Sequence, residues 1–84
     1  MRRVQLSHVQ QRVLKKMSAG WTLSRDLSEP DQAELGRDGE IETINNGTVN
    51  SLHKKGLIRR TRREFPHQWF QLSIKGKDIA NGRA

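Results

Sequence analysis

The sequence predicts one small α+β domain spanning residues 1–84. The N-terminal part has the spacing of an amphipathic helix, a second helical stretch ends at Gly56, and two strand-like stretches follow it. A chain of 84 residues has room for one hydrophobic core, because a domain of this size buries only roughly 60 to 65% of the surface that its unfolded chain exposes. We therefore expect a single domain.

The first helix is predicted to begin after Ser7. Ser7 and Gln10 have the capping-box spacing, in which each side chain bonds the backbone N–H of the other residue. Apolar residues then recur at helical spacing, and Gly20 is placed to adopt the left-handed conformation that ends a helix. The apolar stripe is expected to join the core; it consists of Leu6, Val9, Val13, Leu14 and Met17.

The segment from Trp21 to Ile44 allows two interpretations. The apolar residues near its two ends fit a hairpin of two short strands around an irregular or briefly helical connection. Alternatively, Ser28 caps one short acidic helix that contains Pro30 and ends at Gly36. The first interpretation is slightly preferred, so we expect a weak central hairpin and keep the short helix as the alternative.

A second helix is predicted from the N-cap Asn46 to Gly56. At about 100° per residue, Val49 and Leu52 share the buried side with His53. The opposite side is polar and presents an amide, a hydroxyl and an ammonium group, which can bond base edges or phosphates. These outward residues are Gly47, Asn50, Ser51 and Lys54.

A β-hairpin is predicted after this helix. Its first strand begins at Leu57 and Ile58, its turn lies at residues 65–67, and its second strand is residues 69–72. Strict alternation along the first strand would place Arg60 and Arg62 on one face, with Arg59 and Arg63 on the other. Because arginines on both faces cannot all lie against a core, the outer half of the hairpin should project into solvent.

Charge is distributed unevenly along the chain. The formal net charge is +7 and the sequence pI is about 10.9. All of the nine acidic residues except Glu64 and Asp78 lie between Trp21 and Ile44, whereas residues 48–77 are rich in lysine and arginine. A surface with such a positive region favours nucleic acid or an acidic protein as the partner.

Several classes of function are not expected from this sequence. Cysteine is absent, and the three histidines lack metal-site spacing, so neither a metal nor another cofactor is predicted. No Gly-rich phosphate loop occurs, and so small a chain has little interior for a catalytic pocket, so we expect a protein that is not an enzyme. Without a signal peptide or a membrane-spanning run, we expect a cytoplasmic protein with no membrane partner.

The pattern Thr48-Val49-x-x-Leu52-x-x-x-Gly56-Leu57-Ile58, followed by Phe70-x-Leu72-Ser73-x-x-Gly76, resembles the winged helix-turn-helix family of DNA-binding domains. The resemblance covers residues 44–80 and implies a small winged-helix domain. It implies that a recognition helix enters the major groove and that a hairpin wing follows the DNA backbone or minor groove. The implied contacts are Thr48, Asn50, Ser51, Lys54 and Lys55 from the helix, and Arg59, Arg60, Arg62, Arg63 and His67 from the wing.

Two main functions are compatible with these features. The first is binding of double-stranded DNA by a small transcription regulator. Winged domains often bind DNA as dimers, so a homodimer is one of the expected forms. The second is a protein-interaction module whose basic wing binds an acidic host protein. Small basic chains of this kind resemble regulators and host-protein inhibitors encoded by phages and prophages in bacterial cells. RNA binding ranks third, because few aromatic residues are present to stack on bases.

Overall fold

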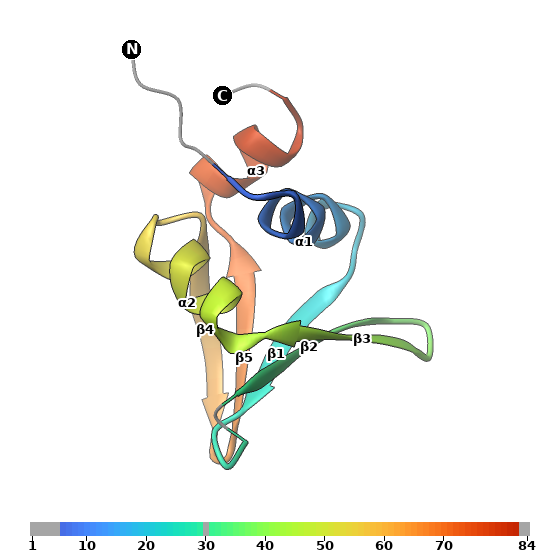
Figure 1. The fold of residues 1–84 in the computed structure, drawn as a ribbon, viewed down its shortest axis with the longest axis vertical. Helices are drawn as coiled ribbons and strands as arrows, with labels where there is room; N and C mark the ends of the chain where they lie inside the picture. Colours follow the sequence, from blue (N-terminus) through green and yellow to red (C-terminus); the bar gives the residue numbers. More distant parts are fainter. Residues whose placement is uncertain (1–5, 30, 83–84) are drawn as a thin grey trace.

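The computed structural model describes residues 6–29 and 31–82, with the side chain of Arg63 outside the description. This part of the chain forms three helices and five strands (Figure 1). In order they are α1 (His8–Ser18), β1 (Thr22–Asp26), β2 (Gln32–Arg37), β3 (Glu40–Asn45), α2 (Asn46–Lys54), β4 (Ile58–Glu64), β5 (His67–Leu72) and α3 (Ile74–Ala80).

The strands form one antiparallel sheet in the order β3-β2-β1-β5-β4. The predicted class, a winged-helix domain, is wrong. Between β1 and α2 the chain forms two further strands, so the domain is a five-stranded antiparallel sheet with helices at the beginning, middle and end of the chain. Both the order and the strand content differ from those of a winged helix.

The predicted capping box of the first helix is confirmed. The Ser7 Oγ accepts a hydrogen bond from the Gln10 N–H at 3.1 Å, and the Gln10 Oε1 accepts one from the Ser7 N–H at 3.0 Å. Gly20 follows the helix with a φ of 100°, as expected for the residue that lets the chain turn away. Local sequence therefore determines both ends of α1.

The central segment differs from both predicted interpretations. The expected end strands exist as β1 and β3, but they do not pair with each other, because β2 lies between them. The short-helix alternative is wrong, since residues 32–37 form a strand in which Ala33 and Leu35 are buried. Asp38 and Gly39 have φ values of 51° and 85°, which suit the two-residue turn of the β2–β3 hairpin.

The second predicted helix is confirmed, with its N-cap one residue earlier. Asn45 is extended and its side chain accepts from the Gly47 N–H at 2.7 Å, which is the N-cap bond. The side chain of Asn46 instead accepts a hydrogen bond from Arg25. Gly56, with a φ of 75°, follows the end of α2, as predicted.

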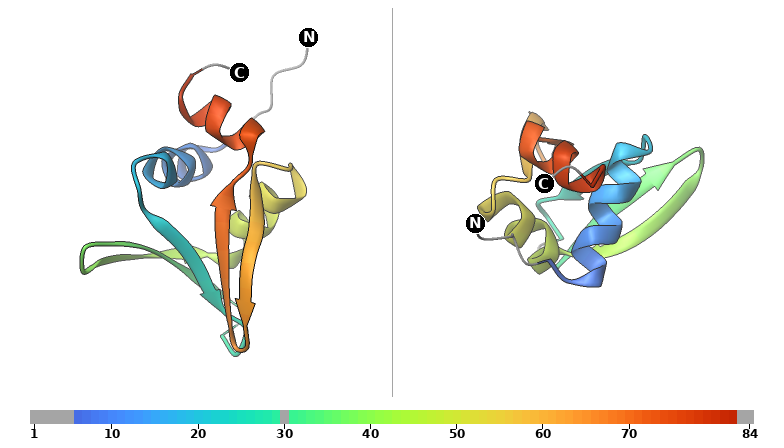
Figure 2. Two further views of the ribbon diagram at one scale, coloured as in Figure 1. Left: turned by 180° about the vertical axis from the view of Figure 1, so that it is seen from behind. Right: turned by 90° about the horizontal axis from the view of Figure 1, so that it is seen from above.

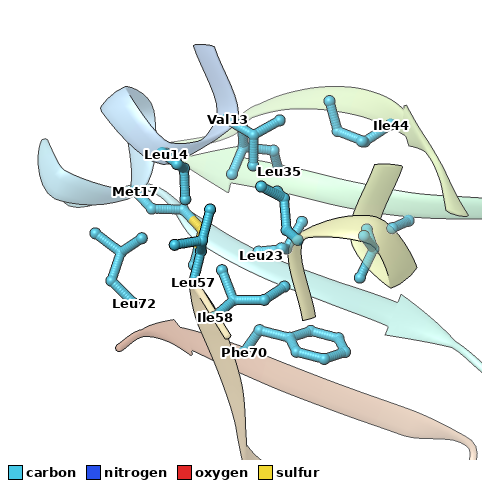
Figure 3. Packing of buried hydrophobic residues seen from close by; sticks show 13 residues of the cluster. Val13, Leu14, Met17, Leu23, Leu35, Ile44, Leu57, Ile58, Phe70 and Leu72 are labelled. Atoms are coloured by element: carbon cyan, nitrogen blue, oxygen red, sulfur yellow. The ribbon is translucent and has the colours of Figure 1, made fainter. Parts of the chain in front are cut away.

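The helices cover one face of the sheet, and the core lies between them. Buried side chains come from α1, α2 and every strand, as well as from Leu57 (Figure 3). Their strand neighbours in sequence lie on the other face and are mostly exposed or half-buried. The β4–β5 hairpin extends well beyond the helices, as the arginine pattern predicted (Figure 1), and the left view of Figure 2 shows the same projection from behind.

Among the described residues, no helix is both long enough and apolar enough to cross a membrane.

Candidate nucleic-acid interface

A bulge in β4 determines the face of the sheet on which each arginine of this strand lies. Arg59 pairs with Gln71 and Arg60 with Phe70, but the register then shifts at Thr61, so Arg62 pairs with Trp69. The shift moves Arg62 to the face that carries Arg59, away from the helices. The predicted pairing of Arg60 with Arg62 on one face is therefore wrong, because strict alternation does not survive a bulge.

The helix-free face of the hairpin, which we call the outer face, combines cations with an aromatic side chain. The guanidinium of Arg62 lies 5.0 Å from the Trp69 ring centroid and donates a hydrogen bond to the Glu64 Oε2 at 2.8 Å. His67 lies beside the same indole, with ring centroids 5.8 Å apart. Because Arg62 and Glu64 are both largely exposed, their ion pair contributes little stability and could exchange for an external anion.

On the helix side of the sheet, Arg25 is held by three amide oxygens. Its Nε donates to the Gln68 Oε1 at 2.8 Å, and its Nη1 donates to the Oδ1 atoms of Asn46 and Asn50 at 3.0 and 2.9 Å. Gln68 is only 2% exposed, so its amide is a fixed acceptor. Neutral acceptors orient the Arg25 guanidinium but leave its positive charge uncompensated.

A second arginine lies close to Arg25. Partial burial of the guanidinium lowers the pKa of Arg25, and the positive charge of Arg60 lowers it further. Arginine stays protonated at neutral pH, so both groups remain cations. Within residues 6–29 and 31–82, neither guanidinium forms an ion pair with a carboxylate. Two neighbouring cations without a counter-charge attract an anion.

Helix α2 lies beside this arginine pair. The ring of His53, in its last turn, contacts the Phe70 ring edge-on at 6.2 Å, so the end of α2 reaches β5. Asn50 and Lys54 are exposed, and their four-residue spacing places them on one side of the helix. Together with Arg25 and Arg60 they form what we call the inner basic surface.

Two other residues predicted to contact DNA, Ser51 and Lys55, are directed away from this surface. The Ser51 Oγ accepts a hydrogen bond from the Gln10 Nε2 at 2.9 Å, and the Lys55 Nζ donates to the Gln10 Oε1 at 3.3 Å, so both side chains are directed toward α1. Thr48 is half-buried. On the hairpin, Arg63 pairs with Gln68 through its backbone, and its side chain lies outside the described residues. DNA contact by these residues stays a prediction.

Arg25 was not among the predicted site residues. Its only signal in the sequence is its spacing of two from Leu23, which places it on the buried face of the same strand. That spacing gives no indication of its partners, which come from α2 and β5. In the described part of the chain, no three His, Cys, Asp or Glu side chains are grouped so that they could hold a metal ion.

Comparisons with known proteins found no match: no family model, no curated protein and no solved structure matches the chain.

Proposed function

We propose that the protein binds double-stranded DNA through the inner basic surface and the β4–β5 hairpin, and acts as a small transcription regulator in the cytoplasm. The observation that carries the proposal is the pair of uncompensated guanidinium groups, Arg25 and Arg60, beside the exposed polar side of α2. A phosphate between or beside these cations would remove their mutual repulsion. The adjoining amide and ammonium groups could contact base edges.

The free edge of the hairpin supports a duplex as the partner. β5 pairs with β1 as far as Asp26–His67, so β4 is the free edge of the sheet end that extends beyond the helices. Arg60 lies on one face of this edge, and Arg59 and Arg62 lie on the other. An edge with cations on both faces can meet phosphates on either side of a groove, whereas a flat acidic protein surface would meet only one face.

The salt dependence of binding tests this proposal. Arg60→Gln should lower affinity for all duplexes alike and reduce the magnitude of the salt slope by about 1, because one phosphate contact is lost. Lys15→Gln is the matched control, since Lys15 is an exposed residue of α1 that belongs neither to the inner basic surface nor to the hairpin, and its loss changes the net charge equally. The measurement is fluorescence anisotropy with a duplex of about 20 base pairs at several salt concentrations.

Equal effects of Arg60→Gln and Lys15→Gln would mean that binding follows net charge alone and would contradict the proposed surface. Absence of duplex binding near physiological salt would overturn the proposal. The acidic-protein hypothesis would then become the better one.

Sequence discrimination is a separate expectation. Selection of bound sequences from random duplexes should enrich a motif, and Asn50→Ala should remove roughly 1 to 3 kcal/mol of discrimination at particular base pairs. Affinity for scrambled duplexes should change much less, because Asn50 is uncharged and Arg25 keeps its hydrogen bonds to Gln68 and Asn46. An enriched palindrome would indicate a two-fold dimer. If Asn50→Ala weakens selected and scrambled duplexes equally, α2 does not contribute to recognition of base sequence.

A further inference from the structure

A groove with a volume of about 490 Å³ lies on the side of the hairpin away from the inner basic surface. The β1–β5 pairing runs from Leu23–Phe70 to Asp26–His67, and the groove opens beyond its Leu23 end. Its walls come from the end of α1, the outer side of β5, the bulge of β4 and the last part of α3. The lining residues that matter here are Trp21, Thr22, Trp69, Gln71, Lys77 and Asn81.

Both tryptophans of the chain line this groove, and each has a cation beside its ring. The Lys16 Nζ lies 4.4 Å from the Trp21 ring, and the Arg62 guanidinium lies 5.0 Å from the Trp69 ring. Neither tryptophan is fully buried. Each of these cations also has a carboxylate partner, Glu42 for Lys16 and Glu64 for Arg62. The half-exposed indoles therefore provide flat apolar surfaces on which a base can stack, and the charge for its phosphate comes from elsewhere in the groove.

Polar side chains complete the groove. Thr22, Gln71 and Asn81 offer hydroxyl and amide groups at its walls, and exposed Lys77 adds a further positive charge. A volume near 490 Å³ is within the usual range for sites that hold small organic groups, about 300 to 1,000 Å³. The donors and acceptors suit the edge of a base, and the lysine suits its phosphate.

We propose that this groove binds unpaired nucleotides of a DNA strand that continues from the duplex, an inference that rests on the proposed function. The bases of a duplex are stacked on one another, so only unpaired or terminal bases can place a flat face on an indole. β4 is one of the two edge strands of the sheet. A strand leaving the inner basic surface can therefore pass around β4, where Thr61 of the bulge lines the groove, and reach Trp69.

Three DNA probes test this inference by fluorescence anisotropy: a blunt duplex, the same duplex with a short unpaired extension, and the extension alone. The extended duplex should bind more tightly than the blunt one. Trp69→Ala should remove that advantage, which amounts to about 5- to 150-fold per stacked base. Trp69→Phe should retain part of it. Binding of the extension should also quench the intrinsic tryptophan fluorescence.

Two further variants control for misfolding and for general loss of charge. Lys77→Glu reverses a charge in the groove at an exposed position, so the fold should be kept while the advantage of the extension falls. Arg60→Gln should weaken both duplexes by the same factor and leave the advantage intact. Equal affinities of the wild-type protein for blunt and extended duplexes would overturn the inference, as would an advantage that survives both Trp69→Ala and Lys77→Glu.

The same probes separate this inference from the proposed function. If the blunt duplex binds normally and the extension adds nothing, the groove proposal alone is wrong. If the blunt duplex does not bind but the extension alone does, and Trp69→Ala abolishes that binding, duplex binding is wrong and the groove remains a site for unpaired DNA.

Discussion

Leu57→Ala should lower the free energy of unfolding by about 2 to 5 kcal/mol, the range for removing a buried leucine side chain. Leu57 is 0% exposed and lies in the centre of the core, between α2 and β4 (Figure 3). Its N–H donates to the Leu52 carbonyl and its own carbonyl accepts from the Ser73 N–H, both at 3.0 Å. The backbone is thus fixed on both sides, which limits how far neighbours can move to fill the cavity.

Urea denaturation followed by circular dichroism measures this loss. Because small domains have a total stability of about 5 to 15 kcal/mol, the variant should lose a large share of it. Ile41→Ala is the control, since Ile41 is 67% exposed and its truncation should change stability by no more than about 0.5 kcal/mol. Similar losses for the two variants would show that Leu57 is not a central core residue.

The parts of the fold that the sequence predicted correctly depend on neighbours in the chain. The capping box of α1 involves residues three apart, and Gly20 and Gly56 each follow a helix with a positive φ. The β4–β5 hairpin likewise joins strands that are adjacent in sequence. Such features are encoded within a few residues, so single-sequence patterns are sufficient to find them.

The central segment was predicted poorly because its structure depends on partners in other strands. β2 contains Gln32, Ala33, Glu34 and Leu35, which are depleted in strands or favour helices. The segment nevertheless forms a strand between β1 and β3, where Ala33 and Leu35 are buried. Tertiary packing overrides local propensity here, and it also makes the predicted winged-helix class wrong.

For the candidate site, the sequence predicted the positive charge of the surface but not the position of each cation. The arginine-rich sequence correctly indicated a projecting basic hairpin, but it could not reveal the bulge at Thr61, which determines the face on which Arg62 lies. The Arg25 network joins β1 to α2 and β5, so it exists only once the sheet has formed. Composition indicates a cationic surface, whereas the position of each cation depends on the register of the strands.

Gly76→Ala should also destabilise the protein, although alanine favours helices more than glycine does. Gly76 is buried in α3 directly against the backbone of Leu57, and an added Cβ would overlap the Leu57 carbonyl oxygen. The Leu57 carbonyl belongs to the buried backbone just before β4 and cannot rotate away as a flexible side chain could. The α3 helix itself must therefore shift. That shift would also disturb Ser73, whose hydroxyl donates to the Gly56 carbonyl at 2.6 Å and whose side chain caps α3.

The expected net loss for Gly76→Ala is up to about 2 kcal/mol, because overpacking costs about 1 to 3 kcal/mol and the higher helix propensity of alanine returns about 1 kcal/mol. Urea denaturation measures the total, and amide hydrogen exchange locates it. The Lys77 N–H, which donates to the Ser73 carbonyl at 2.9 Å, should exchange faster because the start of α3 is displaced. Lys75→Ala, at an exposed position of the same helix, is the control and should leave both measurements nearly unchanged. A Gly76→Ala protein as stable as the wild type would mean that α3 packs less closely on Leu57, and the glycine would then have no packing role at this contact.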